Sequence, residues 1–375
     1  MVILTTCPNC AAPLAHNAPR CGICKTRYCR RDCQKLHWKG GHKELCPVIK
    51  RRGGPEVIYA EKKYKEAVAV AAEKCGEDTK GQTCYICTEA LHWKTKEGLV
   101  RMCACRGTAG FVHVSCLAEQ AKILFAEAVE RNLDDKAAKA WTRWHTCRQC
   151  EQKYHGVVRC ALGWACWKTY VGRPQTDVIR RSAMGQLGNG LSMAERHADA
   201  LSVYEAVLAM ERRLGASEEC FLDVQSNLAT SYSKLGRDEE ALDLRRDLYS
   251  RTLILCGEEA VDTLMEANNY AASLILLDRF EEAKSLYRKT IPVAQRVLGQ
   301  NHELVLGMRL SYAYVLYHGE GATVDDVREA VTTLGKTGET ARRVLGGPHP
   351  LVAQIEGKLR DARAALRARE EPGAP

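Results

Sequence analysis

The apolar positions in the second half of the chain repeat at a fixed spacing. Leu222, Leu264 and Leu306 lie 42 residues apart, and an alanine and a glycine recur at the same interval. These recurring positions are Ala229, Ala271, Ala313, Gly215, Gly257 and Gly299. A fixed period of this length is the signature of a solenoid, in which each helical unit buries its apolar face against the next one. Residues 177–370 are therefore expected to form an all-α solenoid of paired helices.

The first half contains shorter helical patterns that share no period. Within 56–74 the apolar side chains fall near one helical face, so residues 51–79 are predicted to be a helical linker. The segments 117–130 and 135–144 also have the composition of helices. An aromatic stretch follows, and its second part, residues 161–176, is predicted to link the first half to the solenoid.

The cysteines add chemistry to the first half. The chain has 19 cysteines among 375 residues, and seventeen of them precede residue 170. They form C-x2-C pairs with interleaved histidines, which favours metal ligation in a reducing compartment over a disulfide framework. Residues 1–6 lack a basic signal-peptide region, and no window of about 18 apolar residues predicts a membrane span. We expect a cytoplasmic or nuclear protein without a membrane partner.

The thiols and imidazoles fall into two sets of eight possible ligands. Four protein ligands complete a tetrahedral zinc ion, so each set can hold two ions, and four structural Zn²⁺ ions are expected. Since no coordination position stays open for water, zinc-dependent hydrolysis is not expected. The first set is Cys7, Cys10, Cys21, Cys24, Cys29, Cys33, His42 and Cys46. The second set is Cys84, Cys87, Cys103, Cys105, His113, Cys116, Cys147 and Cys150.

The spacing of the second set, C-x2-C, C-x-C, H-x2-C and C-x2-C, resembles the RING-CH (RING-variant) finger of a class of ubiquitin ligases. The resemblance implies a module over residues 80–160 with a helical insertion, in which Ile86 contacts a ubiquitin-conjugating enzyme. It implies no catalytic nucleophile, because RING-type transfer has no covalent intermediate. The implied zinc groups are Cys84, Cys87, His113 and Cys116, and Cys103, Cys105, Cys147 and Cys150. His145 is an alternative ligand to Cys147.

The stretch 33–46 resembles the end of a MYND finger, which assigns residues 1–50 to a first module. Ligands interleave in that family, so the implied zinc groups are Cys7, Cys10, Cys29 and Cys33, and Cys21, Cys24, His42 and Cys46. His37 is an alternative to His42. A fragment of about 40 residues buries too little apolar surface to fold alone, and two zinc ions supply the missing stability. Both fingers are expected to be small α+β modules.

The segments 226–242 and 268–284 resemble tetratricopeptide repeats of the kinesin-light-chain type. Such repeats form a concave groove for protein partners, and the first finger is expected to bind partners as well. Asn227 and Asn269 recur on the first helix of a unit and are candidates for hydrogen bonds to a bound peptide. The alternative role of these side chains is to satisfy neighbouring turns.

The formal charge of +9 is concentrated in residues 1–63, but no nucleic-acid-reading motif accompanies it. We expect the basic face to be solvated or to contact proteins. Two functions remain open. One is a RING-CH-type ubiquitin ligase whose repeats recruit the substrate. The other is a non-enzymatic scaffold, which is favoured by Gln120 in the place where RING-CH fingers often carry a tryptophan.

Overall fold

The structure is a computed structural model that describes residues 7–10, 12, 14, 18–215, 217–319, 321–346 and 349–370. The expectation for residues 1–6 lies outside this part of the chain.

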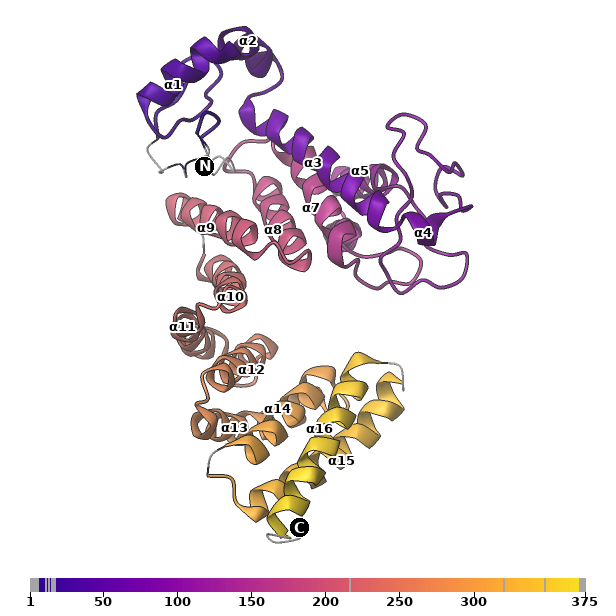
Figure 1. The fold of residues 1–375 in the computed structure, drawn as a ribbon, viewed down its shortest axis with the longest axis vertical. Helices are drawn as coiled ribbons and strands as arrows, with labels where there is room; N and C mark the ends of the chain where they lie inside the picture. Colours follow the sequence, from indigo (N-terminus) through magenta and orange to yellow (C-terminus); the bar gives the residue numbers. More distant parts are fainter. Residues whose placement is uncertain are drawn as a thin grey trace. The chain divides into compact units, whose positions relative to one another are not determined.

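Contacts divide the chain into two compact units, Met1–Asn227 and Leu228–Pro375 (Figure 1). The helices of the first unit are α1 (Arg31–His37), the π-helical turn Trp38–His42, α2 (Lys43–Arg51), α3 (Pro55–Lys74), α4 (Gly76–Thr79), α5 (Val114–Glu130), α6 (Asp134–Trp141), a 3₁₀ turn (Thr142–Trp144), α7 (Gly156–Tyr170), α8 (Val178–Met193) and α9 (His197–Leu214). Helix α10 (Glu218–Lys234) contains the boundary, and the second unit continues with α11 (Asp238–Cys256), α12 (Val261–Leu276), α13 (Phe280–Leu298), α14 (Glu303–His318), α15 (Val324–Leu345) and α16 (Pro350–Glu370).

The zinc modules contain turns and helices in place of sheets. Over the residues that the structure describes, strand pairing is limited to isolated bridges. The bridges join Arg20 to Arg27, Val100 to Val112, and Thr146 to Lys153. The predicted α+β character of the modules is therefore not confirmed.

Helix α7 is central to the first unit. It packs against α3, α5 and α8, and Cys166 and Trp167 are completely buried in it. Two glycines permit the close contact with α8. A Cβ atom at Gly163 or Gly190 would lie 2.9 or 2.8 Å from a carbonyl oxygen of the facing helix. Residues 161–170, which the sequence assigns to an aromatic linker, lie within this helix.

Helix α3 lies against α7 along its apolar face. Pro55 occupies the first turn, where its missing N–H leaves no hydrogen bond unmade. Tyr64 and Val68 are buried on the face that packs on α7. The Arg180 guanidinium of α8 donates to the Glu56 carboxylate at 2.7 Å, and both side chains are largely buried. The predicted helix over 56–74 is thus part of the core of the first unit.

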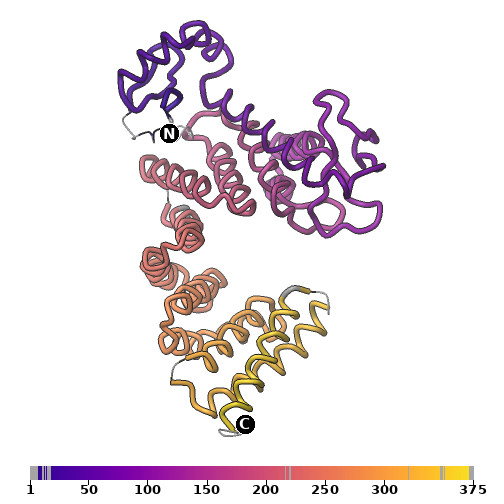
Figure 2. The backbone as a smooth tube through the Cα atoms, in the orientation of Figure 1, coloured from indigo at the N-terminus to yellow at the C-terminus, as the bar shows by residue number. Residues whose placement is uncertain are grey.

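In the second unit, consecutive helices from α11 to α16 pack against one another, as the tube in Figure 2 traces. The predicted helical solenoid is confirmed for this part of the chain. Ala271, Ala283 and Ala313 are fully buried, which allows neighbouring helices to approach closely.

Recurring glycines end three of these helices. Gly257, Gly299 and Gly346 follow α11, α13 and α15, with φ of 83°, 81° and 84° and ψ of 169°, 157° and 151°. This backbone region is essentially restricted to glycine. This backbone conformation explains why a glycine recurs at Gly257 and Gly299 in the 42-residue period.

Candidate metal centres

Three of the C-x2-C pairs adopt the same turn. The N–H of the first cysteine donates to the carbonyl five residues later, at 2.7 Å for Cys21, 3.0 Å for Cys84 and 2.9 Å for Cys147. The residue after the second cysteine is left-handed in each turn, with φ of 66°, 64° and 55°. These residues are Lys25, Thr88 and Glu151. Because the same backbone turn recurs, each cysteine pair can present its sulfur atoms together to one metal ion.

The first ligand group joins a cysteine pair to the start of α1. Its members are Cys7, Cys10, Cys29 and Cys33, whose sulfur atoms all lie within 4.8 Å of one another. The Sγ atoms of Cys10, Cys29 and Cys33 are separated by 3.5, 3.5 and 3.6 Å. Zn–S bonds of about 2.3 Å in a tetrahedron place sulfur atoms about 3.8 Å apart. The donor atoms therefore have the spacing of a tetrahedral zinc site.

The second group consists of four buried side chains, Cys21, Cys24, His42 and Cys46. The Sγ atoms of Cys21 and Cys46 lie 3.6 Å apart, and the Sγ of Cys24 lies 3.4 Å from Nε2 of His42. Of the two histidines considered from the sequence, only His42 belongs to the group. The ring of His37 stacks on that of His42 at 4.8 Å, and its Nδ1 lies 3.0 Å from the hydroxyl of Tyr28.

The third group, Cys84, Cys87, His113 and Cys116, lies at the start of α5. Nδ1 of His113 is 3.4 Å from Sγ of Cys87 and 3.7 Å from Sγ of Cys116. Nε2 of the same ring donates to the carbonyl of Ala90 at 3.3 Å. A histidine that donates from one ring nitrogen directs the lone pair of the other at the metal. The imidazole is completely buried and held in the orientation of a ligand.

The fourth group is Cys103, Cys105, Cys147 and Cys150. The Sγ atoms of Cys105 and Cys147 lie 3.7 Å apart. His145, considered as an alternative ligand from the sequence, is outside the group. Its burial, reinforced by the positive charge of Arg159, lowers the pKa of His145 to about 4. The chain thus presents this imidazole to the protein interior in its neutral form.

The structure brings together the same four ligand groups that the two family resemblances imply. Each group offers three or four thiols and at most one imidazole, the donors that Zn²⁺ prefers in structural sites. With four protein ligands a tetrahedral ion has no open position, so its role is to hold segments together. Cys160 and Cys166 are buried in α7 and lie outside the groups found in the described part of the chain.

Another turn has the same shape without a cysteine pair, and sequence analysis missed it. The N–H of His92 donates to the carbonyl of Glu97 at 3.0 Å. Lys96, which corresponds to the residue after the second cysteine in the other turns, is left-handed with φ of 57°. Thr95 donates from its N–H to Nδ1 of His92 at 3.1 Å, and its hydroxyl, which lies 2.9 Å from the same nitrogen, donates to the Glu97 carboxylate at 3.0 Å. Hydrogen bonds therefore close the turn. The His-x2-Thr spacing, equal to that of C-x2-C, is the signal that could have revealed it.

The remaining predicted site residues lie on two kinds of element. Ile86 is half-buried in the turn between Cys84 and Cys87. The side-chain amide of Asn227 donates to the carbonyl of Asp223 at 3.1 Å, and that of Asn269 lies 3.4 Å from the Glu266 carboxylate. Both amides bond within their own helix, and their role toward a bound peptide stays a prediction.

Comparisons with known proteins identify two of the modules. Residues 7–46 match the family model of the MYND finger, and residues 263–303 match that of the tetratricopeptide repeat. Ubiquitin carboxyl-terminal hydrolase 17 of Arabidopsis thaliana is 53% identical over 39 residues, which are 10% of this chain and 5% of that protein. The chain thus spans about a twentieth of the length of this curated relative.

Two solved structures are similar in outline. A Podosopora anserina putative kinesin light chain with nearly identical TPR-like repeats gives a TM-score of 0.44 at 19% identity, covering 53% of this chain and 91% of that one. BtubC (BKLC) from P. vanneervenii gives a TM-score of 0.35 at 15% identity, covering 70% of this chain and 94% of that one.

Among the described helices, none combines the length and apolar character needed to cross a membrane. The RING-CH resemblance of residues 84–150 stays a prediction, because the family models match other parts of the chain. The chain joins an N-terminal MYND finger to tetratricopeptide repeats, which is a combination of protein-interaction modules.

Proposed function

We propose that the chain is a scaffold whose zinc modules and helical repeats bind different partner proteins. The observation that carries this proposal is the set of four closed ligand groups, in which every tetrahedral position has a protein donor. Metal bound in this way stabilises a surface and activates no water. The repeats supply a separate surface for binding, since stacked helices expose side chains along an extended face.

Affinity purification of the full-length chain with mass spectrometry tests the scaffold. Cys24→Ser removes a ligand of the first finger, and Cys87→Ser removes one of the second. We expect each variant to lose its own subset of partners and to retain those bound by the repeats. Cys256→Ser is the control, because this exposed thiol lies outside the ligand groups. Loss of the same partners in both ligand variants would contradict separate binding surfaces.

We propose, as a second candidate function, that the residue 80–160 module transfers ubiquitin as a RING-CH-type ligase, with the repeats recruiting substrate. Two observations support it. The ligand groups interleave, since the segment with Cys103 and Cys105 lies between the two halves of the third group. The turn at Cys84 presents Ile86 in the place expected to contact a ubiquitin-conjugating enzyme. Such an enzyme would be held close to the substrate without a covalent bond to the ligase.

Autoubiquitination with a panel of conjugating enzymes tests the ligase. We expect Ile86→Ala to reduce ubiquitin-chain formation at least tenfold while zinc content stays unchanged. Ile23→Ala is a matched control, because Ile23 occupies the equivalent place in the Cys21 turn of the first finger and is 49% exposed. Equal activity of the Ile86→Ala variant and the intact chain, or no transfer with any conjugating enzyme, would leave the scaffold as the function.

A further inference from the structure

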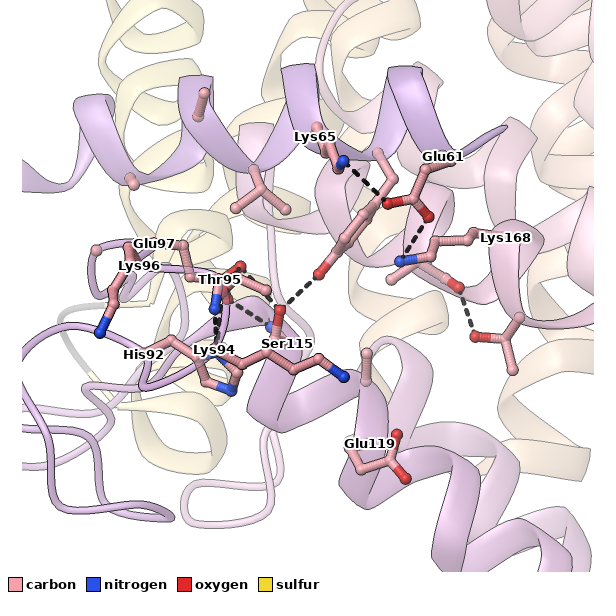
Figure 3. Close-up of a pocket in the computed structure, with 18 of the residues that line it drawn as sticks. Glu61, Lys65, His92, Lys94, Thr95, Lys96, Glu97, Ser115, Glu119 and Lys168 are labelled. Atoms are coloured by element: carbon pink, nitrogen blue, oxygen red, sulfur yellow. Dashed lines mark hydrogen bonds and ion pairs between the residues drawn. The ribbon is translucent and has the colours of Figure 1, made fainter. Parts of the chain in front are cut away.

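A cleft of about 1490 Å³ lies beside the third ligand group, bounded by α3, α5, α7 and the loop that carries the His92 turn (Figure 3). Small or apolar side chains from the three helices line part of it, including Val68, Ala118 and Ala165. The volume exceeds the 300–1,000 Å³ that is usual for small-molecule sites. Its size therefore suits a peptide segment better than a metabolite.

Five lysines and three glutamates line this cleft. Two of the glutamates are neutralised by lysines of the same lining. The Glu61 carboxylate accepts from Lys168 at 2.9 Å and lies 3.5 Å from the ammonium of Lys65, while Lys122 lies 3.3 Å from Glu119. Figure 3 shows Glu61 between Lys65 and Lys168, with Glu119 on another helix of the lining. The helix side of the cleft is thus internally paired.

The third carboxylate, Glu97, is occupied by hydrogen bonds. It accepts from the N–H of Ser115 at 2.7 Å and from the hydroxyl of the same residue at 2.8 Å. Lys94 and Lys96, from the same loop, form no ion pair with the residues that the structure describes. The cleft therefore carries an excess of positive charge, and that excess is located on its loop side.

The His92 turn holds this loop in a defined conformation and presents an aromatic ring. Trp93, inside the turn, is 67% exposed. An exposed tryptophan on an ordered turn next to unpaired lysines combines apolar area with positive charge, as binding surfaces do. The backbone of this turn is held by the hydrogen bonds of His92 and Thr95, so little backbone order is lost when a partner binds.

We propose that this cleft binds an acidic peptide segment of a partner protein. Carboxylates of the segment pair with Lys94 and Lys96, and one of its apolar side chains packs on Trp93. The three glutamates in the lining disfavour a polyphosphate backbone, and the lining contains no arginine, the residue that most often pairs with phosphate and bases. The proposal deepens the scaffold function, on which it rests, by giving the chemistry of one partner.

Selection from a random library of displayed twelve-residue peptides against the immobilised full-length chain tests the proposal. We expect the selected peptides to be enriched in Asp and Glu at least threefold over the library. With Lys94→Glu/Lys96→Glu the enrichment is lost, and with Trp93→Ala an apolar preference beside the acidic residues is lost. A selected peptide, labelled with fluorescein, binds the intact chain at least tenfold more tightly than the lysine variant in polarisation at low salt.

Lys62→Glu/Lys136→Glu is the matched control, because it makes the same change in charge at exposed positions outside the cleft. It is expected to keep the acidic enrichment. Selected peptides without acidic enrichment, or equal enrichment on both double variants, would overturn the proposal. So would binding of a labelled twelve-nucleotide single strand that depends on Lys94 and Lys96 when acidic peptides do not bind. Failure of the scaffold proposal gives a different result, because the intact chain would then capture no partner proteins in the affinity purification.

Discussion

Gly110 is the residue on which the fourth ligand group most clearly depends. Its φ is 87°, and a Cβ atom there would lie 2.6 Å from Cβ and 3.0 Å from Sγ of Cys105. Any side chain would therefore displace a thiol from the group. A glycine is thus needed five residues after Cys105 because the thiol of that ligand packs against its backbone.

Gly110→Ala is expected to lower the zinc content by one ion relative to the intact chain, because the displaced Cys105 no longer completes its group. Native mass spectrometry of the full-length chain measures this directly. Gly107→Ala is the control, because Gly107 has φ of 60° and open space where its Cβ would stand. That variant is expected to keep the zinc content of the intact chain. Equal zinc content in the two variants would show that Gly110 has no role in the site.

At the scale of an element, the start of α15 shows how a helix terminus is fixed. The hydroxyl of Thr323 accepts from the N–H of Asp326 at 3.1 Å, and the Asp326 carboxylate accepts from the N–H and hydroxyl of Thr323. The same carboxylate pairs with Lys284 of α13 at 2.9 Å. Hydrogen bonding to Lys284 lowers the pKa of Asp326 to about 2. One residue thus both caps α15 and joins it to α13.

Asp326→Asn is expected to lower the free energy of unfolding at pH 7 by about 1 kcal/mol, the upper range for a partly exposed ion pair. Because the folded pKa is depressed, the contribution is complete above the unfolded value of about 3.9 and is lost as pH falls towards 2. Urea unfolding from pH 2 to 7 measures the difference between variant and intact chain. Asp325→Asn is the control, since its carboxylate is 90% exposed and pairs only at the surface with Arg328. A difference that does not change with pH would contradict the ion pair.

The glycine that follows α13 is a second feature at this scale. Gly299→Ala is expected to destabilise the fold by about 1–3 kcal/mol, because alanine does not adopt φ of 81° with ψ of 157° without strain. Gly307→Ala, inside α14 with open space at its Cβ, is expected to stabilise by up to about 1 kcal/mol. Thermal or urea unfolding of both variants measures the change in the free energy of unfolding, which is expected to have opposite signs for the two substitutions. Two stabilising substitutions would show that the turn adopts another conformation.

At the scale of the whole molecule, metal and helix packing stabilise different parts of the chain. The four ligand groups all lie within Met1–Asn227, and the helices of Leu228–Pro375 pack through buried apolar side chains. The fingers are expected to depend on metal, as small modules with little core do. The solenoid in the second unit has its own apolar core and no ligand group among its described residues.

Chelation of zinc is expected to remove amide protection from residues 7–46 and 84–150 while α11 to α16 keep theirs. Hydrogen exchange with mass spectrometry, with and without a high-affinity chelator, measures both parts in one sample. Return of protection on adding Zn²⁺ is the control for irreversible thiol oxidation. Equal loss of protection in both units would mean that metal also stabilises the repeats.

Much of this organisation was predictable from sequence, for identifiable reasons. The cysteine spacing predicts the ligand groups because a metal ion needs its donor atoms at fixed separations. The 42-residue period predicts stacked helices because each unit repeats the same contacts. The choice between His37 and His42 followed from family spacing, and the structure places His42 in the group.

Other features depend on contacts that no local pattern contains. The central place of α7 follows from its contacts with α3, α5 and α8, and glycines as far apart as Gly163 and Gly190 reveal it only when the helices face each other. The expected α+β character was not confirmed, because the paired segments extend over single bridges. The cleft beside Trp93 was missed, since its walls come from separate helices.

The His92 turn has a consequence for how this chain responds to its metal supply. The cysteine turns are held partly by a bound metal ion, for which other proteins in a cell compete. Their thiols can also be oxidised. The hydrogen bonds that close the turn at His92 come from its own six residues, with a hydroxyl of Thr95 in the place of a sulfur atom. These bonds use no thiol and no residue of a ligand group, so neither loss of the ion nor oxidation of the thiols removes any of them directly.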